Sequence, residues 1–192
     1  LCQNGEAVEA YYFSTSAGVT STDEIWGSDE AAPYLRSVPC KFDEEEPWSS
    51  WIVELPWKML EDRIREKGEG TVLRSVTVTR RSESGAATAL EAVSDKDSCI
   101  IENEYEIRKF LAPVNCMITE KDGTETAGGS LLPSAYFELE RTQNGNLQVR
   151  GKGYGHGVGM SQTGADKMAE QGYDYREILD YFFRNITVEN LG

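Results

Sequence analysis

Histidine and paired cysteines are scarce in this 192-residue sequence, which has one histidine, His156, and four cysteines. The cysteines stand singly at Cys2, Cys40, Cys99 and Cys116 and form no Cys-x-x-Cys pair. A structural zinc site takes four cysteine or histidine ligands, usually in close pairs, so we expect no metal site. The even number of cysteines permits disulfides in an extracellular protein; the alternative is that they are small buried residues.

Long apolar runs and positive charge are also missing. No stretch approaches the 18 apolar residues of a membrane span, and the first residues shown lack the basic and apolar regions of a signal peptide. The 19 Lys and Arg residues face 33 Asp and Glu residues, and the net charge of −14 argues against binding nucleic acid through its phosphates. The 39% of hydrophobic residues is enough for the core of a single domain over residues 1–192.

The pattern of apolar residues predicts separate strands and short helices without a regular βαβ rhythm, which favours a mixed α+β fold. We expect mostly antiparallel strands and two helices at the C-terminus. Expected strands cover residues 8–14, 51–55, 72–80, 87–93, 98–101, 135–139 and 146–150, and expected helices cover 57–67, 105–111, 166–171 and 175–183. Asn144-Gly145 is predicted to join the last two strands, and Asp174 with Glu177 to cap the last helix.

The start of the chain carries a strong turn signal. Asn4-Gly5 is the dipeptide most typical of a β-hairpin, but only residues 1–3 precede it. A hairpin needs a strand on each side of its turn. We therefore expect that part of the domain lies upstream of Leu1.

The densest signal is residues 151–165, of which six are glycine. From Gly151 to Gly159 every second residue is glycine, which leaves one backbone edge bare for a ligand or another strand. The segment lacks the Gly-Lys-Ser/Thr of a phosphate-binding loop and the context of a dinucleotide-binding fold, so we exclude a nucleotide site. It leads through Ser161 and Gln162 into a helix, whose free N–H groups suit an oxyanion or a polar sugar.

Two further features have both a functional and a structural interpretation. His156, between two of these glycines, is either a residue of a cleft or a buried histidine bonded to backbone, and no Ser-His-Asp order supports a catalytic triad. The hydroxyl groups of residues 14–16, at the end of an aromatic strand, either bind sugar hydroxyls or cap a turn. We expect the two segments to lie side by side and to line one groove.

Several motifs, in order, cover nearly the whole chain. Ser-Thr-Ser-Ala-Gly-Val-Thr at residues 14–20 is followed by Trp26 and by Pro-Tyr-Leu-Arg-Ser-Val at 33–38; Ile107-Arg108 with Leu111 lies between, and Gly-His-Gly-Val-Gly-Met-Ser-Gln begins at Gly155. Together they resemble the stage II sporulation protein D family, which includes the amidase-enhancer proteins.

The chain departs from the pattern of this family in one important respect. Ala17, Cys40 and Phe42 are small departures, at positions where glycine or asparagine, serine and tryptophan are usual. The family's catalytic glutamate, however, lies in a Gly-Glu-Met-Pro-like element before the Ser-Thr-Ser stretch, and that element is absent. The helix that follows it and the cysteine–histidine zinc cluster of some members are absent too. The sequence thus resembles the C-terminal two-thirds of the domain.

The resemblance implies lytic transglycosylation of peptidoglycan in an extracytoplasmic location at the cell wall. A glutamate protonates the glycosidic oxygen between N-acetylmuramic acid and N-acetylglucosamine, and the C6 hydroxyl of muramic acid attacks C1, leaving a 1,6-anhydro end. The implied partners are glycan strands, with a cell-wall amidase or another wall-remodelling protein of sporulation as a further candidate; no cofactor is implied.

In this interpretation the chain supplies the substrate-binding cleft and no catalytic residue, with His156 as an auxiliary group. The expected substrate-binding residues are Ser14, Thr15, Ser16, Gly18, Tyr34, Gly155, His156, Gly157, Ser161 and Gln162. Two other classes remain open: a glycan-binding or amidase-activating module without catalysis, and a structural partner in a remodelling complex.

Overall fold

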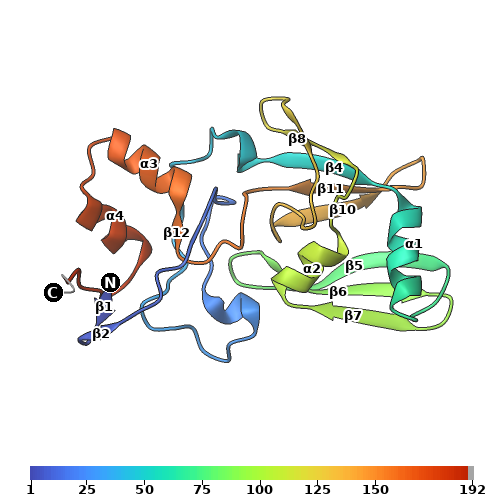
Figure 1. The fold of residues 1–192 in the computed structure, drawn as a ribbon, viewed down its shortest axis with the longest axis horizontal. Coiled ribbons are helices and arrows are strands. Elements are labelled where there is room, and N and C mark those ends of the chain that lie inside the picture. Colours follow the sequence, from blue (N-terminus) through green and yellow to red (C-terminus); the bar gives the residue numbers. More distant parts are fainter. Residues whose placement is uncertain (190–192) are drawn as a thin grey trace.

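The computed structural model describes residues 1–189 and has an elongated shape with two halves (Figure 1). One half holds a five-stranded and a three-stranded sheet, and the other holds the N-terminal strands and the last two helices. Each half has its own cluster of buried apolar side chains. No helix within residues 1–189 is long and apolar enough to cross a membrane.

The two larger sheets are antiparallel, and β4 at the centre of the five-stranded one buries alternate side chains. In β4, Trp51, Val53 and Leu55 are buried while the residues between them are exposed. The five-stranded sheet has the order β10-β11-β4-β8-β9. Its strands are β4 (Trp51–Leu55), β8 (Met117–Glu120), β9 (Glu125–Ala127), β10 (Phe137–Arg141) and β11 (Leu147–Gly151), and those of the three-stranded sheet are β5 (Leu73–Arg81), β6 (Ala87–Ser94) and β7 (Ser98–Glu102).

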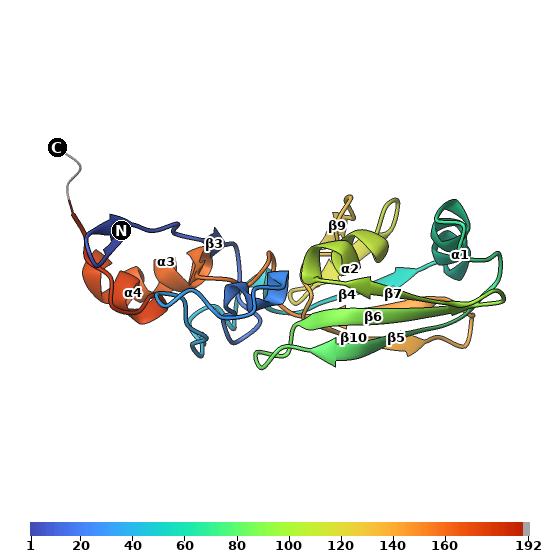
Figure 2. The same ribbon diagram turned by 90° about the horizontal axis from the view of Figure 1, so that it is seen from below.

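Two helices complete this half, α1 (Trp57–Glu66) and α2 (Glu104–Phe110). Figure 2 shows both on the same side of the three-stranded sheet. α1 buries Leu60 and Ile64, which are four residues apart and therefore share one face. Arg63 of α1 donates hydrogen bonds to the carbonyl oxygens of Phe110 and Ala112, so α1 also closes the C-terminal end of α2.

The other half is assembled from the two ends of the chain. Cys2 and Thr187 exchange backbone hydrogen bonds of 2.8 Å in each direction. The elements here are the strands β1 (Cys2–Gln3), β2 (Glu6–Ala7), β3 (Tyr12–Phe13) and β12 (Met160–Ser161), the 3-10 turn η1 (Asp23–Trp26), and the helices α3 (Gln162–Glu170) and α4 (Tyr175–Phe182). A second 3-10 turn, η2 (Pro47–Ser49), leads into β4 and packs against the sheet half. β12 pairs with β3 in parallel, which brings residues about 150 positions apart together.

The expected α+β class is confirmed, with mostly antiparallel strands and two helices at the C-terminus. The strand at 51–55 and the helix beginning at Trp57 are confirmed, as is the pairing of β10 with β11 across Asn144-Gly145. Asp174 and Glu177 form the expected capping box at the start of α4.

The first 14 residues differ from the expectation in their strands. The strand expected at 8–14 is limited to Tyr12 and Phe13, because only these residues find a strand partner, on β12. The hairpin at Asn4-Gly5 forms between β1 and β2, and its two turn residues have φ of 54° and 81°. Residues 1–7 close this hairpin by themselves, so the turn does not require a further strand upstream.

The remaining differences concern short elements. α3 begins at Gln162 and not at residue 166, because Ser161 caps it by accepting a hydrogen bond of 3.2 Å from the Gly164 N–H. β8, β9 and β12 are four, three and two residues long and were not predicted, since such short runs carry little periodicity. All four cysteines are free thiols; Cys2 and Cys40 are buried and the other two half-buried.

The glycine-rich segment crosses between the halves and lies against residues 11–17. A Cβ atom on Gly153 would come within 2.8 Å of the Ala17 nitrogen, and one on Gly159 within 2.2 Å of the Tyr11 carbonyl oxygen. Both glycines have positive φ, of 75° and 79°. The bare edge expected from the alternating glycines is therefore used by another backbone segment of the same chain.

This packing predicts that Gly159→Ala destabilises the fold strongly. Gly123, with φ of +87° and no atom within 4 Å of the position that a Cβ would take, is the matched control. Gly123→Ala should cost about 1–2 kcal/mol from backbone strain alone. Gly159→Ala should cost about 1–3 kcal/mol more, because its methyl group collides with the Tyr11 carbonyl. Urea denaturation of both variants measures the difference, and equal losses would contradict the close approach.

Candidate functional site

The Ser-Thr-Ser loop and the glycine-rich segment are neighbours, as the sequence predicts. Thr15 and Tyr154 exchange backbone hydrogen bonds, with N···O distances of 3.1 and 2.8 Å. Two hollows border this contact. One, of about 310 Å³, is lined by Ser16, Gly18 and Lys152, and the other, of about 350 Å³, by residues that include Tyr154.

Behind this contact lies a buried carboxylate that sequence reasoning missed, Asp43, which is 1% exposed. Its Oδ2 accepts hydrogen bonds from the Ser16 N–H (2.7 Å) and the Ser161 hydroxyl (2.6 Å). Its Oδ1 accepts from the Ser16 hydroxyl at 2.8 Å, and Thr163 adds a longer bond of 3.3 Å. A buried carboxylate is stable only when hydrogen-bonded in this way. Asp43 thus joins the Ser-Thr-Ser loop to the start of α3.

The sequence carries a weak signal for this group. Asp43 lies in a region of irregular structure beside Glu44-Glu45-Glu46, where an acidic residue is typical of a solvated run. The available clue is that two hydroxyl-rich motifs, 14–16 and 161–163, need a shared acceptor if both are buried.

The predicted binding residues therefore fall into two sets. Thr15, Ser16, Gly157 and Ser161 are buried, and the hydroxyls of the two serines are bonded to Asp43. The other set reaches the surface: Ser14, Gly18, Tyr34, Gly155 and His156 are half-buried and Gln162 is exposed.

His156 is half-buried and packed between aromatic rings. Its ring lies edge-on to Phe13 and Trp26, with centroid distances of 5.8 and 5.2 Å. Its Nδ1 accepts a hydrogen bond of 3.1 Å from the Val158 N–H. Burial lowers the pKa of His156, the positive charge of Arg108 lowers it further, and a hydrogen bond to the Tyr12 backbone acts in the opposite direction. The ring is therefore neutral at pH 7 and combines the two interpretations, a backbone-bonded histidine with one side at the surface.

Next to His156 lies a second buried charge cluster. The Trp26 Nε1–H donates to Glu104 at 3.1 Å, and Glu104 forms an ion pair with Arg108 at 3.1 Å. Arg108 also donates to the carbonyl oxygens of Leu132 and Pro133, at 2.9 and 3.3 Å. The Ile-Arg-x-x-Leu motif thus marks a structural arginine, and its partner Glu104 was not predicted.

This arrangement supports binding better than acid–base chemistry. The two buried carboxylates next to the site, Asp43 and Glu104, are engaged by donors. Cys40 lies 3.5 Å from Asp43, and burial together with that charge raises the pKa of its thiol to about 12, so it is protonated and a poor metal ligand. The surface near these carboxylates offers the ring of Tyr12, the hydroxyl of Ser14, the amide of Gln162 and the neutral imidazole of His156.

We predict that Asp43→Asn lowers the free energy of unfolding by about 2–4 kcal/mol, because an amide group then faces hydrogen-bond donors. Asp29→Asn, in an exposed turn, is the control and should leave stability unchanged. Urea denaturation compares the two variants. A loss for Asp43→Asn no greater than for the control would show that the carboxylate does not hold the two segments together.

Because His156 is the only histidine in the sequence, its titration can be followed without overlap from other imidazole groups. We expect an NMR-measured pKa for His156 below the ordinary value of 6.5. Since the unfolded ring then binds a proton more readily than the folded one, the stability of the wild type relative to His156→Phe should fall as pH decreases below about 6.5. A pKa at or above 6.5 would contradict the burial of the ring.

The chain is similar to known proteins over almost its whole length. Stage II sporulation protein D of Bacillus amyloliquefaciens is 29% identical over 188 residues, which are 98% of this chain and 47% of the relative. Stage II sporulation protein D of Bacillus subtilis is 28% identical, with the same coverage, and the amidase enhancer of Bacillus subtilis is 22% identical over 98% of this chain and 30% of its own length. The chain spans less than half the length of these curated relatives.

These names agree with the resemblance drawn from the motifs. A family model described as "Domain of unknown function (DUF8618)" matches residues 36–159, well over half of the chain. The match begins within the Pro-Tyr-Leu-Arg-Ser-Val motif and ends inside the glycine-rich segment, so it contains both sheets of the larger half and Asp43. The chain belongs to the family of the domain of unknown function DUF8618.

Proposed function

We propose that this chain is the glycan-binding part of a protein that remodels peptidoglycan at the cell wall, outside the cytoplasm. The observation that carries the proposal is the surface where β3 meets the glycine-rich segment. There, Tyr12 is 60% exposed, Ser14 and His156 are half-buried, and Gln162 is exposed at the start of α3. Hydroxyl, amide and aromatic groups in one place suit a sugar, which offers hydroxyls and an apolar ring face.

We propose that the complete protein cleaves glycan strands by lytic transglycosylation. A glutamate outside this chain donates its proton to the glycosidic oxygen as the bond from that oxygen to C1 of N-acetylmuramic acid breaks. The C6 hydroxyl oxygen bonds to C1 and passes its proton to the glutamate, now a carboxylate, so the 1,6-anhydro end forms without water and the acid is restored. This chain binds the sugars on either side of that bond and orients them.

His156 has a positioning role in this proposal and is not a nucleophile. Its Nδ1 is already bonded to the Val158 N–H, and the ring contacts Phe13 and Trp26. Its contribution is to fix the aromatic side chains next to the sugar-binding surface.

A second candidate is a non-catalytic module that binds glycan and activates a cell-wall amidase. The similarity to the amidase enhancer, which extends over 98% of this chain, favours it. The buried carboxylates Asp43 and Glu104 fit it as well, since both are taken up by structural contacts. An amidase is accordingly the proposed protein partner, beside the glycan strands.

The two candidates share a prediction for the chain alone: it binds purified glycan strands without stem peptides and releases no 1,6-anhydro ends. Gln162→Ala should weaken binding about three- to tenfold, the value of one hydrogen bond, whereas Gln171→Ala at the other end of α3 should not. Co-sedimentation measures binding and mass spectrometry detects anhydro ends.

The outcomes separate the candidates. Release of anhydro ends by the chain alone would place the acid within residues 1–192 and overturn the proposed division. Absence of binding would overturn both candidates. Cleavage by the whole gene product would select transglycosylation, and strand binding without cleavage would select the activating module.

A further inference from the structure

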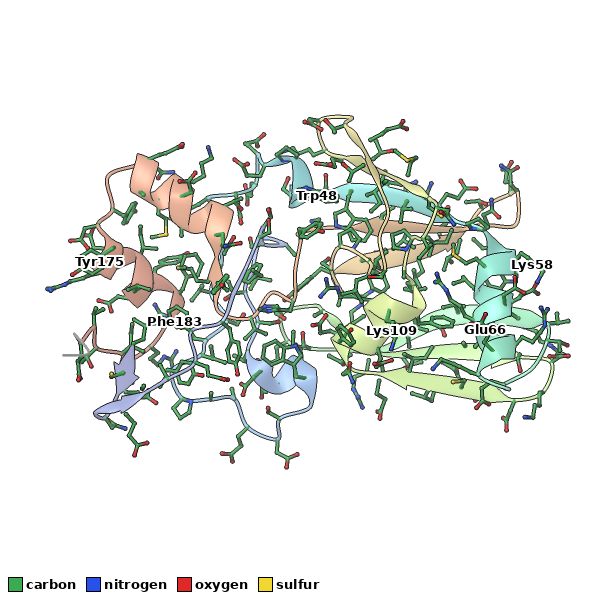
Figure 3. The ribbon with its side chains drawn as sticks, in the orientation of Figure 1. Trp48, Lys58, Glu66, Lys109, Tyr175 and Phe183 are labelled. Atoms are coloured by element: carbon green, nitrogen blue, oxygen red, sulfur yellow. The ribbon has the colours of Figure 1, made fainter. Side chains whose placement is uncertain are left out.

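The strand β7 (Ser98–Glu102) forms an open edge of the three-stranded sheet. The order of that sheet is β5-β6-β7, and no described segment lies beyond the outer edge of β7 in Figure 1. In Figure 3, the labelled Glu66 and Lys109 mark α1 and α2, which lie over the sheet and not beyond this edge. An edge strand offers its unpaired backbone groups to any other strand, and proteins usually block such edges.

The other three edges of the two larger sheets are each blocked. The edge strand β9 is only three residues long, and β10 has charged side chains at three of its five positions. The pairing of β5 is broken by register shifts, and α1 covers its start. There, the Trp57 Nε1–H donates to the Leu73 carbonyl at 3.1 Å, and Glu61 accepts from the Leu73 N–H at 3.2 Å. These are the usual protections of a sheet edge.

The strand β7 has none of these protections. It is five residues long and pairs with β6 without a break in register. Its sequence, Ser-Cys-Ile-Ile-Glu, contains no proline, and its one charged residue is the last, Glu102. We therefore expect this edge to be covered by another strand.

The backbone of β7 has free hydrogen-bonding groups on its outer side. The Asn103 N–H donates to the Thr88 carbonyl at 3.1 Å, so this pair is a bonded pair of the β6–β7 ladder. Bonded and non-bonded pairs alternate along an antiparallel ladder, so the N–H and C=O groups of Ile100 and Glu102 point away from β6. In the part of the chain that the structure describes, these two N–H groups have no hydrogen-bond partner.

The open edge is also apolar and electrically neutral. The Ile100 side chain is 51% exposed. Glu102 forms an ion pair with Arg80 of β5 at 3.2 Å, which leaves β7 without an unpaired charge. A basic partner would find no free carboxylate on this strand, although the whole protein has a net charge of −14. An uncharged apolar strand suits it better, and β7 of a second copy is such a strand.

The sequence of β7 is complementary to itself in an antiparallel pair. A two-fold axis at Ile100 places this residue opposite Ile100 of the second copy, and places Ser98 opposite Glu102. The outward N–H and C=O groups then bond across the axis, and no charge faces a like charge. In this register the two exposed isoleucine side chains lie next to each other and cover one another.

We propose that two copies of this chain associate through β7, which joins their three-stranded sheets into one antiparallel sheet of six strands. A contact made by one pair of short strands is smaller than the roughly 1,200 Å² of a stable interface, so the dimer is weak, with a Kd of about 0.1 mM. The negative charges of the two copies repel each other. Added salt screens this repulsion and should tighten the dimer.

Sedimentation velocity of the 192-residue chain over about 0.01–1 mM tests the proposal. Ile100→Lys places a charge on the edge and should raise the Kd at least about tenfold. Ile100→Pro removes one outward N–H, which an edge strand tolerates, and should weaken the dimer similarly. Ile52→Lys is the matched control and should not change the Kd, because Ile52 is 39% exposed on the central strand β4. Hydrogen exchange of the Ile100 and Glu102 amides should slow as the concentration of the wild type rises.

Three results would overturn this proposal. The first is a monomer throughout the concentration range. The second is a dimer that either variant at Ile100 leaves intact, since another surface then forms it. The third is association that weakens as salt is added, because it would show contacts between opposite charges and not the pairing of neutral strands. Circular dichroism confirms that the variants are folded, and glycan binding, measured separately, tests the proposed function independently.

Discussion

One buried carboxylate, that of Asp43, holds together the two segments that form the candidate site. It lies at the centre of donors from the Ser-Thr-Ser loop and from the beginning of α3, where Ser161 is 118 positions away along the chain. An ionised group in such a place is tolerated because its oxygens accept several hydrogen bonds at once. These hydrogen bonds to Asp43 fix the geometry of the surface formed by Ser14 and Gln162.

The alternating glycines also hold these chain segments together, through close backbone contacts. Gly153 and Gly159 let two chain segments approach more closely than any side chain would allow, so the bare edge of the run is used for contact within the chain. Tyr154 and His156, two of the side chains that interrupt the glycines, are then the ones presented outward. The glycines therefore position the segment, and Tyr154 and His156 between them reach the surface.

The two halves of the molecule contribute differently to this surface. The sheet half supplies rigid neighbours, Trp48 before β4 and the Glu104–Arg108 pair of α2, and the end-to-end half supplies β3, β12 and α3. Figure 1 shows the glycine-rich segment running between them. The proposed binding surface therefore lies where the halves meet, and its shape depends on both hydrophobic cores.

Local patterns by themselves determined the α+β class, the alternating strand β4, the capping box of α4 and the turn at Asn144-Gly145, because each depends on residues close in sequence. The motifs also identified the two segments that meet at the site. Only the tertiary structure decided that β3 is two residues long, that Ser16 and Ser161 are buried and bonded to Asp43, and that Glu104 pairs with Arg108. These features are contacts between residues far apart in the chain, whose burial and pairing exist only once both cores have packed.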